Sequence, residues 1–308
     1  MRAGDGPHIL LIHGSAADHR TWSIQLASPL RTQFTLIAYD RRPDASIERH
    51  ADDAAAVLAG AAAPTGAAAA AGSAGAAAPT TDGAAGLAGA APTSDAAAVL
   101  TGAAPTSDAA AVLAGAAPST LVIGSSFGAV VALDLVRRHS TAVAGAVLIE
   151  PPLAASDDAA PVPPSFLPAF DRRAAQGGGP AAGELFLRRV LGDDAYDRMP
   201  RVFQAQATAK FAEIRADTIA LMAYRPRYAE LAAVTTPILL VGGERSGPSF
   251  RPTLDALRRA LPAARLEILT AAGHMLHAEA PRRFNALVTA FAAPLIGSLT
   301  HPSVDPPG

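Results

Sequence analysis

The chain has 308 residues, half of them hydrophobic, and a formal net charge of −2. This balance provides no basic surface for nucleic acid or an anionic membrane, so we expect a small-molecule substrate as the partner. There is no cysteine, which excludes disulfides, thiolate catalysis and cysteine-based metal sites. No apolar run reaches the roughly 18 residues of a membrane span, and the N-terminus lacks a signal-peptide pattern, so a cytoplasmic location is expected.

Short, continuously apolar runs alternate with segments of helical periodicity along most of the chain. The runs that we interpret as buried strands are 8–12, 34–40, 120–123, 146–149, 237–241 and 265–269. The predicted helices are 20–30, 47–58, 127–139, 252–261 and 281–291. This alternation predicts an α/β fold with a doubly wound, mostly parallel sheet.

Residues 61–115 do not follow this plan. The segment 89–101 recurs almost unchanged as 102–114, and each copy contains a Gly and a Pro that interrupt helices. We interpret 61–115 as an Ala-rich, low-complexity insertion, a tandem expansion of one helix end with no role in the chemistry. The alternative is a functional lid, because long irregular insertions sometimes have that role.

Residues 151–232 form a second departure from the alternation of strands and helices. They contain amphipathic helical stretches between the predicted strands 146–149 and 237–241. We therefore expect a helical cap at 151–232, on a core made of 1–150 and 233–296. The last residues, 297–308, are typical of a flexible tail.

The sequence Gly124-Ser-Ser126-Phe-Gly128 joins a predicted strand directly to a predicted helix. Two residues of minimal bulk allow the serine between them to stand at the tip of a sharp turn, below the free N–H groups of the new helix. This Gly-x-Ser-x-Gly pattern is typical of a nucleophile elbow, so Ser126 is the predicted nucleophile. The alternatives are a helix-capping serine and a phosphate loop. The absence of Gly-Lys-Ser/Thr and of Gly-x-Gly-x-x-Gly disfavours a phosphate loop.

A nucleophilic serine needs a base, and His274 is the first candidate. It follows the predicted strand 265–269 and should therefore stand at the same sheet edge as Ser126, where the carboxyl ends of parallel strands meet. His277 is the alternative base. A metal cluster of His274, His277 and Glu279 is disfavoured because the His-Glu-x-x-His order is absent, and we expect no metal.

Two carboxylates compete for the role of orienting the base. Glu150 ends the strand 146–149, and Glu244 ends the strand at 237–241. A carboxylate at the tip of a buried strand is costly unless it is paired, and a histidine would satisfy it. A salt bridge to Arg225 or Arg227 is the alternative for either acid.

Acyl transfer also requires two N–H donors for the developing oxyanion. The residue after the nucleophile, Phe127, provides one of these amides. The turn after the first strand, at Ser15, is the predicted source of the other. The chain order of nucleophile, acid and histidine is the order found in α/β-hydrolases.

Four motifs stand out: Leu-Ile-His13-Gly14, Ala-Tyr39-Asp40-Arg41-Arg42, Val-Ile-Gly-Ser-Ser-Phe-Gly128 and Ala-Gly273-His274-Met. Together they resemble the α/β-hydrolase superfamily. Val-Leu-Ile-Glu150-Pro-Pro and Gly-Gly-Glu244-Arg-Ser resemble, in particular, a group of actinobacterial α/β-fold serine hydrolases. The resemblance implies a cofactor-independent serine hydrolase with a helical cap, acting on a small carboxylic ester or a related acyl substrate.

The chain departs from the family pattern in three places. The first two family strands normally precede His-Gly, so the resemblance implies about six strands here and an exposed sheet edge. The family aspartate after the penultimate strand falls near Ser246, which favours Glu150 as the acid, as in dehalogenase-like relatives. Pro43 replaces a usual glycine. Dehalogenation is disfavoured because it needs an aspartate where this chain has Ser126.

Two other classes of function stay open at this point. The same elbow and triad serve acyl transfer and carbon–carbon bond cleavage, which sequence does not separate from ester hydrolysis. A catalytically degraded member of the family is the remaining alternative.

Overall fold

The computed structural model describes residues 1–62 and 120–296. The predicted insertion from residue 63 onward and the predicted tail 297–308 lie outside the described residues. The strands are β1 (Arg2–Ala3), β2 (His8–Ile12), β3 (Thr35–Ala38), β4 (Leu121–Ser125), β5 (Gly145–Ile149), β6 (Ile238–Gly243) and β7 (Ala264–Leu269). The α-helices are α1 (Ser23–Leu26), α2 (Ile47–Ala62), α4 (Phe127–Arg138), α5 (Phe166–Leu191), α6 (Asp193–Arg198), α7 (Arg201–Ala209), α8 (Phe211–Ala223), α9 (Tyr228–Leu231), α10 (Phe250–Ala260), α11 (Leu276–Glu279) and α12 (Pro281–Ala292). Short 3₁₀ turns are η1 (His19–Trp22), η2 (Pro29–Thr32) and η4 (Ser140–Ala142).

The strands form one sheet in the order β1-β3-β2-β4-β5-β6-β7. Every neighbouring pair is parallel except β1 and β3, which run antiparallel with Ala3 opposite Leu36. The predicted α/β fold with a mostly parallel sheet is confirmed. The expected number of about six strands is wrong by one, because β1 contains only two residues and has no apolar pattern from which to predict it.

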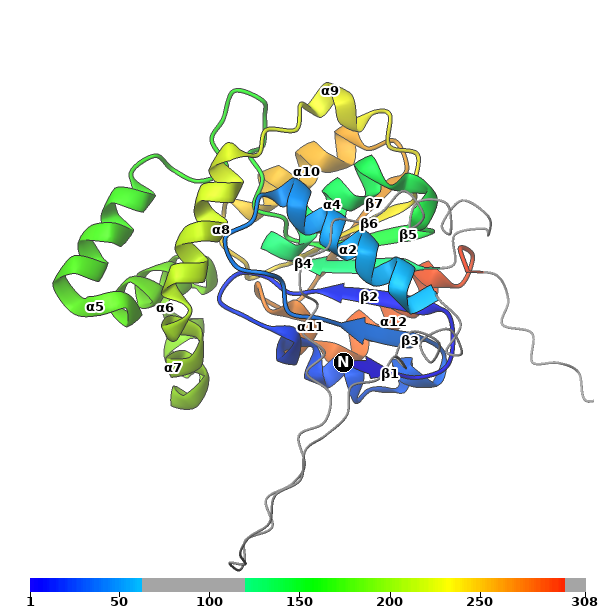
Figure 1. Cartoon of the computed structure of the whole chain (residues 1–308), viewed down its shortest axis with the longest axis horizontal. Helices are drawn as coiled ribbons and strands as arrows, with labels where there is room; N and C mark the ends of the chain where they lie inside the picture. The colour runs from blue at the N-terminus through cyan, green and yellow to red at the C-terminus, as the bar shows by residue number, and fades with distance from the viewer. Residues whose placement is uncertain (63–119, 297–308) are drawn as a thin grey trace, which may run out of the picture.

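Side chains of the central strands pack alternately against the two faces of the sheet. In β2, Leu10 and Ile12 belong to one apolar core, whereas Ile9 and Leu11 belong to the other. Helices α2, α4 and α10 cover the first face, and α11 and α12 cover the second (Figure 1). Burial on both faces explains why these strands are apolar at every position.

The predicted helix 20–30 is replaced by three short helical segments, namely the 3₁₀ turns η1 and η2 with the α-helix α1 between them. The side chain of Asp18 accepts a hydrogen bond from the Arg20 amide at the start of η1. The side chain of Ser28 accepts one from the Leu30 amide, and Pro29 then opens η2. Because these side chains cap the backbone within so few residues, the apolar spacing of this segment does not produce a continuous helix.

Helices α5 to α9 lie between β5 and β6, and α5 to α8 stand together on one side of the sheet (Figure 1). Within α5 the backbone leaves the helical conformation at Gly178, whose φ is 78°, next to Pro180. Phe166 and Phe170 of α5 form a small separate core with Ile214 of α8. Within residues 1–62 and 120–296, no helix has the length and apolar character needed to span a membrane.

Candidate active site

The turn between β4 and α4 holds Ser126 in an uncommon backbone conformation, with φ 55° and ψ −121°. A Cβ atom at Gly124 would lie 2.2 Å from the backbone oxygen of Gly128, and one at Gly128 would lie 2.3 Å from that of Ile12. No side chain fits at either glycine without displacing backbone. Ser126 itself is half-buried between fully packed neighbours, so its hydroxyl is the group that this turn presents.

Glu150 and His274 form a buried pair at the same edge of the sheet. Glu150 follows β5 and His274 follows β7, and Oε2 of the glutamate lies 2.6 Å from Nδ1 of the imidazole. The two side chains are 1% and 3% exposed. The other carboxylate oxygen, Oε1, accepts a hydrogen bond of 2.7 Å from the Gly243 amide. Both oxygens therefore have a donor, as a buried carboxylate requires.

The His274 ring is also held from its face. It stacks on Phe250 of α10 with the ring centroids 4.5 Å apart and the planes 17° from parallel. Within the described residues, Nε2 of His274 has no hydrogen-bond partner, and none joins this ring to the Ser126 hydroxyl. The ring is thus fixed through Nδ1 and its face, and Nε2 is left without a contact in the described residues.

Glu244, the second candidate acid, does not contact His274. It is exposed, and its carboxylate accepts a hydrogen bond of 2.8 Å from the Ala271 amide. This contact ties the loop after β6 to the loop after β7. Of the two candidate acids, the structure brings only Glu150 to the histidine.

His277, the alternative base, points into the core instead. Its ring lies 4.7 Å from that of Trp22, with the planes tilted by 38°, and contacts Phe284 edge-on. Both ring nitrogens are buried without a hydrogen-bond partner in the described part of the chain. Burial, and secondarily the neighbouring His274, lowers the pKa of His277 to about 3. Glu279 accepts a hydrogen bond from the Gly273 amide and does not form a cluster with the two histidines.

The turn after β2 lies against the elbow, because a Cβ atom at Gly14 would be 3.0 Å from the Cβ of Ser126. The carbonyl oxygen of Gly14 contacts Nδ1 of His13 at 2.8 Å and accepts from Nη2 of Arg41 at 3.3 Å. Since the peptide unit is planar and trans, the N–H of Ser15 points away from these groups. Among the described residues, no acceptor is present for the amides of Ser15 or Phe127, the predicted oxyanion donors.

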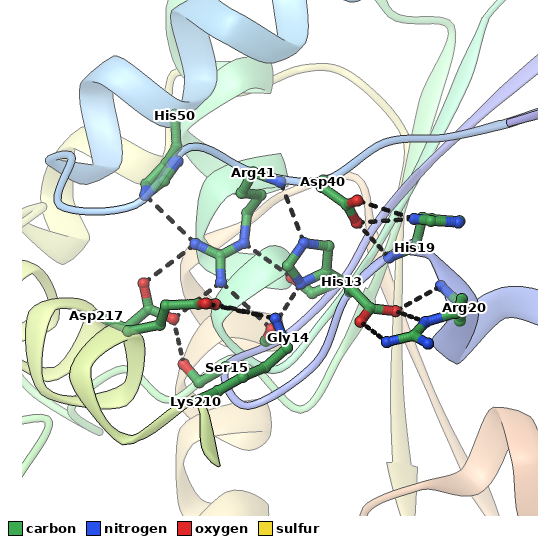
Figure 2. Close-up of polar contacts among 12 residues, drawn as sticks. His13, Gly14, Ser15, His19, Arg20, Asp40, Arg41, His50, Lys210 and Asp217 are labelled. Atoms are coloured by element: carbon green, nitrogen blue, oxygen red, sulfur yellow. Dashed lines mark hydrogen bonds and ion pairs between the residues drawn. The ribbon is translucent and has the colours of Figure 1, made fainter. Parts of the chain in front are cut away.

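Arg41 is the centre of the polar network behind this turn (Figure 2). Its two terminal nitrogens donate to Oδ1 and Oδ2 of Asp217 at 3.1 and 2.8 Å. Further contacts reach the His13 carbonyl oxygen at 3.2 Å and Nε2 of His50 at 3.3 Å, and the guanidinium lies 4.3 Å from the centre of the Phe127 ring. Asp217 is in α8, so this network joins the α5–α9 helices to the sheet.

Burial, a backbone hydrogen bond and the charge of Arg41 together set the protonation of His13 and His50. Nε2 of His13 accepts from the Arg41 amide at 3.1 Å, so Nδ1 carries the ring proton that faces Gly14. Burial first, and the nearby Arg41 second, lower the pKa of His13 to about 4 and that of His50 to about 3. Both rings are therefore neutral at neutral pH.

A cleft of about 970 Å³, counted with the space at its open mouth, reaches from the elbow to the α5–α9 helices. Ser126 and Ser15 line it on the side of the sheet. Phe166 and Phe186 of α5 and Phe250 of α10 contribute much of the apolar wall. The cleft joins the elbow, the turn after β2 and the face of the ring that stacks on His274, so a small molecule bound there would meet all three.

The sequence profile of the alpha/beta hydrolase family matches residues 9–287. The chain belongs to the alpha/beta hydrolase family. A comparison with curated protein sequences gave no significant match.

Solved structures of other proteins share this hydrolase fold. A thermophilic esterase from Thermogutta terrifontis, solved with malate bound, is 20% identical with a TM-score of 0.66, over 96% of this chain and 93% of that one. The enol-lactonase from Burkholderia xenovorans LB400 is 18% identical with a TM-score of 0.64, over 94% of each chain. Est816, described as an enzyme that degrades N-acyl homoserine lactones, is 19% identical with a TM-score of 0.62, over 94% and 95%.

One group of side chains in the described part of this hydrolase has the spacing of a metal site. The ligand atoms of Asp18, His19 and Asp40 lie within 4.8 Å of one another. Asp18 is already paired with Arg20 at 2.6 Å, and Asp40 accepts from the His19 backbone amide at 2.7 Å and contacts its ring (Figure 2). These contacts account for the cluster without an ion.

Asp217 was not predicted as a site residue, although the sequence carries a signal for it. Asp217 shares a helical face with Ile214 and Leu221, at spacings of three and four residues. An acid at a core-facing position of an amphipathic helix requires a buried cationic partner. That partner is Arg41, which follows β3 in the motif Ala-Tyr39-Asp40-Arg41-Arg42.

Proposed function

We propose that this hydrolase is a serine hydrolase of small carboxylic esters or related acyl substrates. Ser126 is the nucleophile, His274 the general base and acid, and Glu150 the group that orients His274. The observation that carries the proposal is the buried contact of 2.6 Å between Glu150 Oε2 and His274 Nδ1. It holds the imidazole with the opposite nitrogen unoccupied, which is the state in which a histidine accepts a proton from a serine.

The reaction proceeds in two halves. The Ser126 hydroxyl gives its proton to Nε2 of His274 while its oxygen bonds to the acyl carbon, and the carbonyl oxygen becomes an oxyanion. The bond to the alcohol then breaks, and the alcohol leaves with the proton from His274. A water molecule then gives a proton to Nε2 of His274 while its oxygen bonds to the acyl carbon of the acyl-enzyme. The bond to Ser126 breaks, the serine oxygen takes the proton back from His274, and the acid is released. Glu150 stays ionised throughout.

The amides of Ser15 and Phe127 are the proposed oxyanion donors. Both lie beside the Ser126 turn and are without an acceptor in the described residues. His13 and Arg41 both contact the Gly14 carbonyl oxygen. The Ser15 N–H belongs to the same planar peptide unit, so these contacts also fix the direction of the N–H, away from His13 and Arg41. Donors that are fixed before the reaction stabilise the oxyanion without reorganising, which is the basis of their large contribution to catalysis.

The substrate class follows from the cleft. Its wall is mostly apolar, which suits the hydrocarbon part of an ester, and its size suits a small molecule. We propose that residues 151–232 act as the cap of this cleft, on a core of residues 1–150 and 233–296. A protein described as an esterase and one described as an enol-lactonase share the fold, which supports an ester bond as the target here.

The test combines activity with labelling of the nucleophile. We expect Ser126→Ala to lower kcat on 4-nitrophenyl butyrate by about 10³-fold or more, since the triad then lacks its nucleophile. A fluorophosphonate probe should label wild-type protein and not Ser126→Ala. Ser165→Ala, which removes an exposed hydroxyl at the start of α5, is the matched control and should be labelled like wild type. Equal hydrolysis by Ser126→Ala and wild type would disprove the proposal.

A further inference from the structure

Among the described residues that line the cleft, Arg189 has the one charged side chain. The other described lining residues are apolar side chains, prolines, serines and threonines. Arg189 belongs to α5, whereas Ser126 lines the cleft from the edge of the sheet. In the part of the cleft formed by residues 1–62 and 120–296, a single positive charge thus stands among neutral side chains, on a different wall from the nucleophile.

Most hydroxyl groups of the cleft already donate to other groups. The Ser15 hydroxyl donates to Asp217 at 2.7 Å, that of Thr218 to the Ile214 carbonyl oxygen at 2.7 Å, and that of Thr253 to the Leu153 carbonyl oxygen at 2.8 Å. These side chains have no further proton to offer a ligand. Apart from the predicted oxyanion amides, Arg189 is therefore the strongest donor that the cleft presents.

Arg189 is unpaired in the described part of the chain, in contrast to its neighbour. Arg188 forms ion pairs with Glu184 at 2.8 Å, Asp193 at 3.1 Å and Asp197 at 2.8 Å. No carboxylate lies within ion-pair distance of Arg189 in residues 1–62 and 120–296, and its guanidinium stands 5.8 Å from the centre of the Phe166 ring. Three acids close to Arg189 in the sequence are engaged by Arg188, and the Arg189 guanidinium stands near the ring of Phe166, which also lines the cleft.

We propose that Arg189 binds a carboxylate of the substrate, at the end remote from the bond that Ser126 attacks. The substrate class is then an ester or lactone that carries a negatively charged carboxylate separated from the scissile acyl group by an apolar chain. A guanidinium matches a carboxylate with two parallel hydrogen bonds. One positive charge with few other donors suits a monoanion better than a phosphate dianion. This inference rests on the proposed serine-hydrolase function.

The first experiment compares two esters that differ in one charge. They are the 4-nitrophenyl monoester of adipic acid and its neutral methyl ester, assayed with wild type and Arg189→Gln. We expect wild type to favour the anionic ester, and Arg189→Gln to lower that preference in kcat/KM by about tenfold, equivalent to 1.4 kcal/mol. The preference of wild type should also weaken with added salt, because the Arg189 head is exposed to solvent.

Two further variants separate local recognition from general charge effects. Arg173→Gln removes a positive charge from an exposed position of the same helix that does not line the cleft, and should keep the wild-type preference. Arg189→Glu should disfavour the anionic ester still more strongly than Arg189→Gln does. An unchanged preference in both Arg189 variants overturns the inference, as does an equal loss in Arg173→Gln.

A binding measurement distinguishes failure of this inference from failure of the proposed function. Monomethyl adipate and dimethyl adipate are titrated calorimetrically into Ser126→Ala and into Ser126→Ala/Arg189→Gln. Tighter binding of the monoanion that is lost in the double variant supports the Arg189 site even if wild type hydrolyses neither ester, in which case the proposed function alone fails. Equal binding of the monoanion to both proteins, or no binding to either, overturns the Arg189 site whatever the activity.

Discussion

Asp217 of α8 and Arg41 of the loop after β3 form a buried ion pair with two hydrogen bonds, of 3.1 and 2.8 Å. The side chains are 9% and 5% exposed, so neither charge is well solvated. Arg41 also binds the carbonyl oxygens of His13 and Gly14, and Asp217 accepts from the Ser15 hydroxyl. One residue pair thus connects the α5–α9 helices with the turn that carries a proposed oxyanion amide.

Asp217→Asn should reduce both stability and turnover. The substitution keeps the shape but leaves the Arg41 charge buried without its partner, which costs about 3 kcal/mol of the free energy of unfolding. The Gly14–Ser15 turn then loses part of its support, so we expect kcat to fall by about tenfold with a smaller change in KM. Urea unfolding and steady-state kinetics measure the two effects.

The matched control is Arg215→Gln on the same helix. Arg215 pairs with Asp171 at 2.8 Å, and the two side chains are 47% and 45% exposed. An exposed pair contributes at most about 1 kcal/mol, so this variant should unfold almost like wild type and keep its kcat. If Asp217→Asn behaves in the same way, the network does not support the turn.

Glu150→Gln and Glu244→Gln should differ sharply in activity. Glutamine at 150 keeps an acceptor for the Gly243 amide but has no negative charge to orient and stabilise the protonated His274, so kcat should fall by about 10³–10⁴-fold. Glutamine at 244 still accepts from the Ala271 amide and should leave kcat unchanged. Rates of 4-nitrophenyl butyrate hydrolysis by the two purified variants show which of the two acids orients His274. A large loss in Glu244→Gln, with Glu150→Gln active, would reverse the assignment.

Gly128→Ala tests the close packing below the elbow. The new methyl group would lie 2.3 Å from the Ile12 backbone oxygen, and strand and helix must separate to admit it. We expect a loss of about 3 kcal/mol or more in the free energy of unfolding, together with loss of fluorophosphonate labelling.

Gly60→Ala is the control for Gly128→Ala. Gly60 is in α2, and within the described residues no atom outside its own stretch of helix lies within 4 Å of the position that a Cβ would occupy. The same change there should leave labelling intact and stabilise the protein by up to about 1 kcal/mol, since alanine favours helix. Equal destabilisation by both substitutions would show that the space below Ser126 is not the cause.

The stability of the protein should fall as the pH is lowered from about 6.5 toward 4. The pKa values of His13, His50 and His277 are lowered by burial to about 4, 3 and 3, so the unfolded chain takes up protons in this range and the folded chain does not. For His277 alone, the difference in unfolding free energy between pH 7 and pH 5 is about 2 kcal/mol.

His277→Leu isolates this contribution. The ring makes no side-chain hydrogen bond within the described residues, so its replacement leaves no polar partner behind. Urea unfolding of both proteins at pH 7 and pH 5 should give a smaller pH difference for the variant by about 2 kcal/mol. An identical pH difference in the two proteins would mean that His277 binds its proton equally well when folded.

Much of the fold was predictable because its signals are local. Continuous apolar runs mark strands that are buried on both faces, and the glycines around Ser126 mark a turn without room for side chains. The segment 20–30 was mispredicted since side-chain caps at Asp18 and Ser28 override its apolar spacing. The two residues of β1 have no pattern at all.

The candidate site was predictable only in part, because several of its side-chain contacts join residues that are far apart in the sequence. Glu150 and Glu244 both follow a strand, and only the resemblance to the family, with Ser246 near the position of its aspartate, favours Glu150 as the acid that reaches His274. The pair of Arg41 and Asp217 joins residues 176 positions apart, so no spacing rule connects them. Such contacts depend on how α8 is placed over the sheet, which periodicity does not determine.

The close contact between the rings of Trp22 and His277 gives the molecule an optical reporter of its own. The chain contains one tryptophan, and its indole is fully buried at a ring distance of 4.7 Å from the imidazole. Its fluorescence should therefore shift to longer wavelength when the core opens, and a protonated imidazole at that distance would quench it. Unfolding and the titration of His277 can both be followed by emission, without a dye or an engineered probe.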